Sequence, residues 1–260
     1  MKFIISKLSH AAGGALLGSI VFACSAGDPG GSEQLGEVQQ ALDADVETCL
    51  SLTAFNAIIG TPGNDVLTGT AEPDCIAGLG GQDVITVVGT GDLALGGEGD
   101  DVINGGAGED FLRGGNGQDT INGGANRDHI FGEGGDDVLS GGDDNDSIEG
   151  GPGQDRIFGN AGNDDRLLGD DGDDQIFGGN GSDGIFGGPG NDRLNGEADV
   201  DFVNGEEGDD ILSGGGGDDF INDCSGHNQL NGGAGIDDCF YDATQSSAVS
   251  CETGISNCVP

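Results

Sequence analysis

Aspartate recurs every nine residues along most of this chain of 260 residues. The recurrence defines twenty register positions, of which nineteen are Asp and one is Asn. They are Asp65, Asp74, Asp83, Asp92, Asp101, Asp110, Asp119, Asp128, Asp137, Asp146 and Asp155, then, after one inserted residue near Asn163 and Asp164, Asp165, Asp174, Asp183, Asp192, Asp201, Asp210, Asp219, Asn228 and Asp237. A fixed short period sustained this long predicts a solenoid, in which each repeat packs on its neighbours.

A second series with the same period lies two residues after each register position. Eighteen of these twenty residues are Ile, Leu or Val; the others are Ala94 and Cys239. Alternate side chains of a strand point to opposite faces, so a three-residue strand after each register position places this apolar residue inward. The six remaining residues of each repeat are rich in the chain's 57 glycines, which permit a tight turn with positive φ.

These patterns predict an all-β fold, a parallel β-roll over residues 59–240. Two repeats form one coil, and twenty repeats form about ten coils of 18 residues. A short N-terminal segment precedes the roll, and residues 241–260 are expected to cap its far end.

The repeats resemble those of the repeats-in-toxin family, also called RTX or hemolysin-type, whose nonapeptide reads G-G-x-G-x-D-x-U-x with U a large aliphatic residue. Clean copies are GGEGDDVIN at residues 96–104 and GGPGNDRLN at residues 187–195. The resemblance implies that Ca²⁺ lies between a turn and the equivalent turn one coil later. Its ligands would be aspartate carboxylates and turn carbonyls, and such oxygen-only sites suit a hard cation.

The expected calcium ligands are seventeen of the register aspartates, and two stacks of ten turns would hold up to about 18 ions. The ligands are Asp65, Asp83, Asp101, Asp110, Asp119, Asp128, Asp137, Asp146, Asp155, Asp165, Asp174, Asp183, Asp192, Asp201, Asp210, Asp219 and Asp237.

Three turns depart from the motif and are expected to bind calcium weakly or not at all. The turn before Asp92 lacks three of its expected glycines. Asn228 replaces a register aspartate, and Glu72 replaces a glycine before Asp74.

The chain carries 48 acidic against 7 basic residues, a net charge of −41. This charge disfavours nucleic acid and anionic lipid as partners and favours cations. Bound Ca²⁺ would offset the repulsion and contribute folding energy, as structural metals do.

The N-terminus has the features of an export signal. Lys2 and Lys7 precede a short apolar stretch ending in Val21-Phe22-Ala23-Cys24, which resembles a bacterial lipobox. Residues 1–23 are therefore expected to be removed and Cys24 to carry lipid, the only predicted contact with a membrane. An ordinary cleaved signal is the alternative. Either gives an exported protein, at the outer membrane and cell surface or extracellular.

Residues 24–58 are expected to form a flexible tether and an N-terminal cap, with a short helix over residues 33–42. Six further cysteines flank the repeats, which suggests disulfides in an exported chain. Cys49 and Cys75 are the expected first pair, and two more bonds are expected among Cys224, Cys239, Cys251 and Cys258. Free buried thiols are the alternative.

The function expected is calcium binding by a non-catalytic, calcium-dependent folding module with a structural or adhesive role. The alternative is a secreted hydrolase or sugar epimerase, or an accessory module of one. No H-E-x-x-H or G-x-S-x-G motif supports this, and His129 is expected on the roll's surface. A pore-forming toxin, the third interpretation, would need a hydrophobic domain.

The phenylalanines of the repeats occupy outward positions. Phe111, Phe131, Phe186, Phe202, Phe220 and Phe240 fall on one sheet face, whereas Phe158 and Phe177 fall on the other. Stacking between coils would stabilise the strands. The alternative is a surface for a protein or glycan partner.

Overall fold

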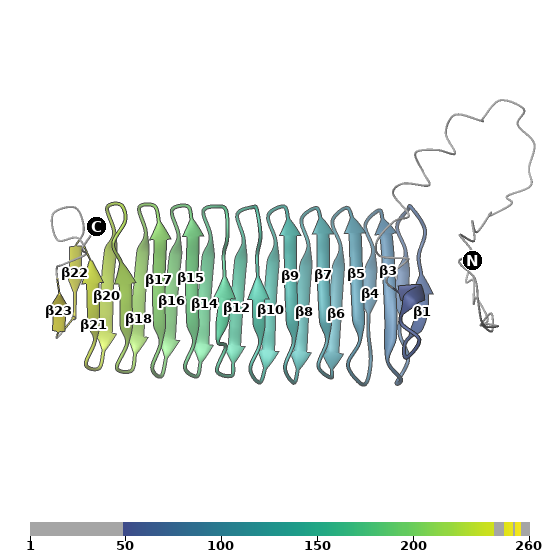
Figure 1. Ribbon diagram of the computed structural model, residues 1–260, viewed down its shortest axis with the longest axis horizontal. Helices are drawn as coiled ribbons and strands as arrows, with labels where there is room; N and C mark the ends of the chain where they lie inside the picture. Colours follow the sequence, from purple (N-terminus) through teal and green to yellow (C-terminus); the bar gives the residue numbers. More distant parts are fainter. Residues whose placement is uncertain (1–48, 242–246, 252, 256–260) are drawn as a thin grey trace, which may run out of the picture. The chain divides into compact units, whose positions relative to one another are not determined.

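The structure is a computed structural model and describes residues 49–241, 247–251 and 253–255 (Figure 1). All the described residues belong to one unit of the chain, Ala44–Pro260, which contains the roll. The predicted signal peptide, Cys24 and the predicted helix over residues 33–42 lie outside the described residues. Within the described residues, no helix is long and apolar enough to cross a membrane.

Apart from a short helical segment at residues 49–51, the regular structure of the described residues consists of strands. The strands are β1 (Asn56–Ile59), β2 (Val66–Thr68), β3 (Asp74–Gly80), β4 (Val84–Thr86), β5 (Leu93–Glu98), β6 (Val102–Ala107), β7 (Phe111–Asn116), β8 (Thr120–Ala125), β9 (His129–Gly134), β10 (Val138–Asp143), β11 (Ser147–Glu149), β12 (Arg156–Ala161), β13 (Arg166–Leu168), β14 (Gln175–Asn180), β15 (Gly184–Pro189), β16 (Arg193–Ala198), β17 (Phe202–Glu207), β18 (Ile211–Gly216), β19 (Phe220–Asp223), β20 (Gln229–Ala234), β21 (Asp238–Tyr241), β22 (Ser247–Val249) and β23 (Thr253–Ile255).

The odd-numbered strands form a 12-stranded sheet and the even-numbered strands an 11-stranded sheet. Each strand pairs in parallel with the strand two places along the chain, as β6 does with β8, so the chain winds alternately through the two sheets. Figure 1 shows the coils side by side from β1 to β23. The predicted parallel β-roll is confirmed.

The predicted apolar series forms a continuous core between the two sheets. From Ile76 to Cys239, every one of these residues is at most 2% exposed. Leu67, in the first coil, is only partly buried. One aliphatic side chain per repeat therefore fills the narrow space between the sheets.

Most strands are longer than the three residues expected. In β6, pairing with β8 continues past Asn104 to Gly106 and Ala107 but skips Gly105. The chain thus bends at the first glycine of the motif and then resumes parallel pairing. We number the repeat from this glycine, so the register aspartate is its sixth position.

The predicted register is wrong at the insertion, where Asp164 rather than Asp165 occupies the register position. Asp164 is fully buried and its Oδ1 accepts a hydrogen bond of 2.7 Å from the N–H of Asp146, whereas Asp165 is exposed. The extra residue lies between the turn and β13. There it bulges outward, so Leu167 still pairs with Ile148 and remains in the core.

Disulfides join cysteines at both ends of the roll. Cys49 is bonded to Cys75, the pair expected from the sequence, and Cys239 is bonded to Cys251. Cys224 is also disulfide-bonded, and Cys258 lies outside the described residues. The first bond belongs to a small apolar cluster outside the main core, in which Leu52 and Phe55 also pack. The segment before β1 therefore covers part of the first coils.

The outward phenylalanines contact one another between coils, as the stacking interpretation predicts. Ring centroids are 4.8–5.5 Å apart along the series Phe186, Phe202, Phe220 and Phe240 on the 12-stranded sheet. Phe158 and Phe177 stack at 5.3 Å on the other sheet. His129 is exposed at the start of β9, as expected.

Candidate metal centres

The register residues form two continuous rows, one along each edge of the roll, because alternate repeats turn at opposite edges. The backbone N–H of each donates to the side-chain Oδ1 of the register residue one coil later, at 2.7–3.0 Å. Eighteen such bonds link Asp65 to Asn228 in one row and Asp74 to Asp237 in the other. From Asp83 onward, one carboxylate oxygen of each register aspartate is therefore a structural acceptor, a role that the motif alone did not indicate.

The second oxygen of these carboxylates has no protein partner along most of the roll. In all sixteen register aspartates from Asp83 to Asp219, with Asp164 in place of Asp165, Oδ2 is buried and no donor in the described residues reaches it. Each of these residues is at most 3% exposed. Native proteins leave few buried polar atoms unsatisfied, so a series of this length requires positive partners.

In most repeats the first residue is a glycine, which leaves room beside this oxygen. A Cβ placed on Gly96 would collide with Oδ2 of Asp101 and with the main-chain oxygen of Gly114, one coil later. Gly132 has the same relation to Asp137 and to the oxygen of Gly150. A carboxylate oxygen and a carbonyl oxygen thus converge between successive turns, and both are ligands that Ca²⁺ prefers.

Burial makes these carboxyls hard to ionise. It raises the pKa of Asp137 to about 7 and that of Asp146 to about 8. The hydrogen bond from the preceding coil lowers each pKa, whereas neighbouring aspartates raise it. A cation between the turns would favour the ionised form.

Within the described residues, no three side chains of His, Cys, Asp or Glu gather at one point as a metal cluster. Each gap instead combines register carboxylates with main-chain oxygens. The residues fit a hard cation bound by oxygen alone, and none of these groups is a nitrogen or sulfur ligand.

The first coil departs from this arrangement. Oδ2 of Asp65 accepts hydrogen bonds from the N–H of Thr61 at 2.6 Å and from its hydroxyl at 2.9 Å. Oδ2 of Asp74 accepts from Thr70 in the same way. In this coil a threonine at the second position of the repeat therefore donates to the oxygen that a cation is expected to contact in the other coils. The structure does not support Asp65 as a calcium ligand.

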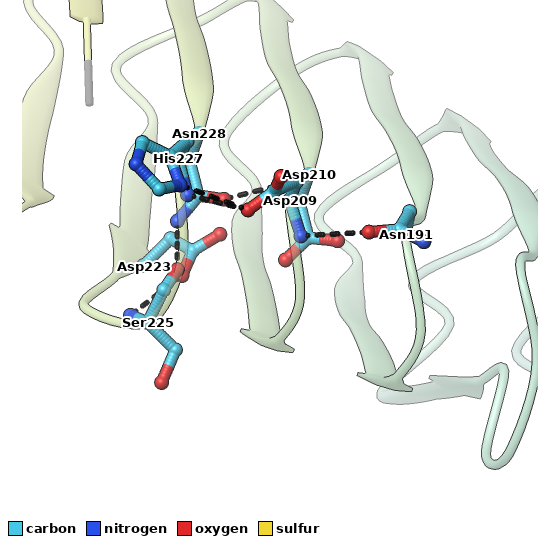
Figure 2. A network of polar contacts seen from close by, with 7 residues as sticks. All are labelled: Asn191, Asp209, Asp210, Asp223, Ser225, His227 and Asn228. Carbon is cyan, nitrogen blue, oxygen red and sulfur yellow. Dashed lines mark hydrogen bonds and ion pairs between the residues drawn. The ribbon is translucent and has the colours of Figure 1, made fainter. Parts of the chain in front are cut away.

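The degenerate turns at Asp92 and Asn228 differ from each other in structure. Val87 takes the first position before Asp92, and its side chain is buried in the core. In the other turn Asn228 keeps the row intact, since its Oδ1 accepts from the N–H of Asp210 at 2.7 Å (Figure 2). Asp223, which sequence reasoning did not assign to a site, occupies the first position there and is fully buried. The sequence signal that could have identified this residue is an aspartate at a position where the motif has glycine.

A parallel β-roll with a buried row of carboxylates along each edge defines the class of repeat proteins whose turns bind cations between coils. Sequence comparison shows the particular family. This chain belongs to the RTX calcium-binding nonapeptide repeats. Matches to the family cover residues 58–87, 95–130, 113–148, 131–165, 150–185, 163–194, 186–221 and 205–239.

These matches establish calcium binding by the repeat module. They omit residues 88–94, which contain most of the degenerate turn at Asp92. A search of curated proteins found no significant match.

Proposed function

We propose that this chain is an exported, non-catalytic module whose β-roll folds when calcium binds between its coils. The observation that carries the proposal is the series of buried Oδ2 atoms from Asp83 to Asp219 that lack a protein donor. Each such carboxylate opposes folding when ionised and alone, and a cation between the turns removes this cost.

The proposed ligands are the buried register aspartates whose turns keep the first glycine, with Asp164 replacing Asp165. Asp65 and Asp74 are left out, because a threonine already donates to the Oδ2 of each. They are Asp83, Asp101, Asp110, Asp119, Asp128, Asp137, Asp146, Asp155, Asp164, Asp174, Asp183, Asp192, Asp201, Asp210, Asp219 and Asp237. One ion for each gives at most sixteen at these positions, below the upper limit of 18 expected from the sequence.

The uniformity of the acidic groups supports a non-catalytic role. Asp137, Asp155 and Asp174 have the same burial, the same hydrogen bond and the same first-position glycine as their neighbours. A catalytic acid would differ in environment from the residues that flank it. Calcium ligation accounts for the whole series.

Export and lipid attachment complete the proposal. The disulfides Cys49–Cys75 and Cys239–Cys251 support an oxidising compartment. Lipid at Cys24 rests on the sequence alone, and mass spectrometry of the protein from its native membrane tests it. A peptide that begins at an unmodified residue would contradict the anchor.

An adhesive role is proposed for the phenylalanine rows of the 12-stranded sheet. Phe111 and Phe220 are 40% and 36% exposed, so their rings offer apolar surface to a protein or glycan. Replacing both by Ala should weaken attachment to glycan arrays while calcium-dependent folding persists. Equal attachment by the wild type and the variant would limit the rings to strand stabilisation.

Calcium counting tests the ligand assignment. Equilibrium dialysis of the folded protein against calcium, with magnesium in excess, should show more than ten bound calcium ions, because Mg²⁺ loses its water reluctantly and demands near-octahedral geometry. Binding of only one or two calcium ions would refute the assignment of the rows.

A further inference from the structure

Two of the twenty repeats lack glycine at the first position, and they do so in opposite ways. Val87 is apolar and packs into the core, so it adds no ligand. Asp223 is acidic and fully buried, and it belongs to the one repeat whose sixth position is Asn228 instead of Asp. In this repeat the carboxylate has moved from the sixth position to the first.

The carboxylate of Asp223 lies beside that of Asp210, the register aspartate one coil earlier (Figure 2). A Cβ placed on Gly205, the first glycine of the Asp210 repeat, would lie 2.6 Å from Oδ2 of Asp210 and collide with Oδ2 of Asp223. At Gly96 and Gly132 the atom in the second place is a main-chain carbonyl oxygen of the next coil. Asp223 therefore supplies a charged oxygen where other turns supply a neutral one.

The remaining polar groups of this turn are already paired. Asn228 accepts from the N–H of Asp210 and its side-chain amide donates to the main-chain oxygen of Ser225. Oδ1 of Asp223 accepts from the N–H of Ser225 at 3.2 Å. The two Oδ2 atoms of Asp210 and Asp223 are buried and receive no donor from the described residues.

Two buried carboxylates this close cannot both be ionised without a positive charge between them. We propose that a divalent cation, Ca²⁺ in the first instance, binds between Asp210 and Asp223, at the last turn of this row that the structure describes. The inference rests on the proposed function, since it assumes that cations occupy the neighbouring gaps. It reverses the expectation that the Asn228 turn binds weakly, because calcium affinity increases with the number of charged ligands.

Counting calcium ions by native mass spectrometry tests this site. At a calcium concentration that just saturates the wild type, Asp223→Asn should bind one ion fewer, because this gap then has one charged ligand instead of two. The matched control is Asp209→Asn, which removes the same charge from an exposed neighbour whose Oδ1 can still accept from the N–H of His227. It should bind the same number as the wild type. Asp223→Gly combined with Asn228→Asp rebuilds the motif and should restore the ion that Asp223→Asn loses.

An unchanged count and an unchanged calcium titration for Asp223→Asn, with calcium bound by the wild type, would overturn this inference and leave the proposed function intact. A wild type that binds no calcium would overturn both. If Asp223→Asn does not fold, anomalous scattering from wild-type crystals with calcium or terbium decides. A peak within roughly 2.3–2.6 Å of both Oδ2 atoms supports the site. Peaks in the other gaps without one here would contradict the site and would mean that the carboxylates of Asp210 and Asp223 share a proton.

Discussion

From Asp83 to Asp219, each register aspartate uses its two carboxylate oxygens differently. Oδ1 accepts from the backbone of the preceding coil, whereas Oδ2 is buried and receives no donor from the described residues. The first is satisfied within the chain, and the second is the basis of the cation dependence. Asparagine separates the two roles, because it keeps Oδ1 and loses the charged Oδ2.

Asp137→Asn should therefore fold into the same roll but need more calcium to do so. We expect the calcium midpoint to rise by about tenfold, which corresponds to about 1.4 kcal/mol. Asp136→Asn is the control, because Asp136 is adjacent, equally charged and exposed. Circular dichroism during a calcium titration measures both midpoints. Equal midpoints for the two variants would contradict the division of roles.

Glycine at the second position avoids backbone strain, and some repeats lack it. Glu206 occupies this position with φ of 76°, in the left-handed region. Glu206→Gly should be more stable than Glu206→Ala by about 1 kcal/mol, because both lose the charge and only Gly loses the Cβ that strains this conformation. Thermal unfolding in saturating calcium compares them. A more stable alanine variant would show that the strain is negligible.

At the scale of the strands, aromatic rows connect successive coils on the outside. The ring of Phe202 contacts the rings of both Phe186 and Phe220, whereas among the described residues the ring of Phe177 contacts one other aromatic ring, that of Phe158. Phe202→Leu should destabilise the roll by about 1–2 kcal/mol and Phe177→Leu by about half as much, because an aromatic pair adds about 0.5–1.5 kcal/mol beyond its buried area. Unfolding in urea with calcium present gives the two values. A larger loss for Phe177→Leu would contradict this ranking.

The parallel pairing of the roll and its aliphatic core could be predicted from the sequence, because an aspartate and an aliphatic residue each recur once in every nine residues. The end of the roll was predicted at residue 240, whereas β22 and β23 continue the two sheets to Ile255. The insertion could not be placed, since Asp164 and Asp165 are both aspartates and only packing distinguishes the buried from the exposed one. Thr61 and Asp223 were missed for a related reason. Their roles depend on which oxygen they approach in space, and the motif treats both as departures from glycine.

At the scale of the whole molecule, the buried carboxyls couple folding to pH. Their pKa values are raised, for Asp137 and Asp174 to about 7, from the ordinary value of 3.8. Without calcium, the folded roll would hold protons that the unfolded chain releases as the pH rises through this interval. Its stability should then fall as the pH rises, by about 1.4 kcal/mol for each pKa unit of each group.

Calcium-free protein should consequently show more β structure at about pH 5 than at about pH 7.5, the lower value being still above the sequence pI of 4.1. Protons and calcium compete for the same oxygens, so the calcium midpoint should be higher at the lower pH. Circular dichroism at the two pH values tests both statements. Less β structure at the lower pH would contradict the sign of the coupling.

Calcium dependence of the fold itself is the central claim. Small-angle X-ray scattering and circular dichroism on one sample, before and after addition of millimolar calcium at about pH 7.5, test it most directly. The account predicts an expanded chain with little β structure after chelation, and a compact β-roll after calcium is restored. The same radius of gyration and the same β signal in both conditions would contradict it.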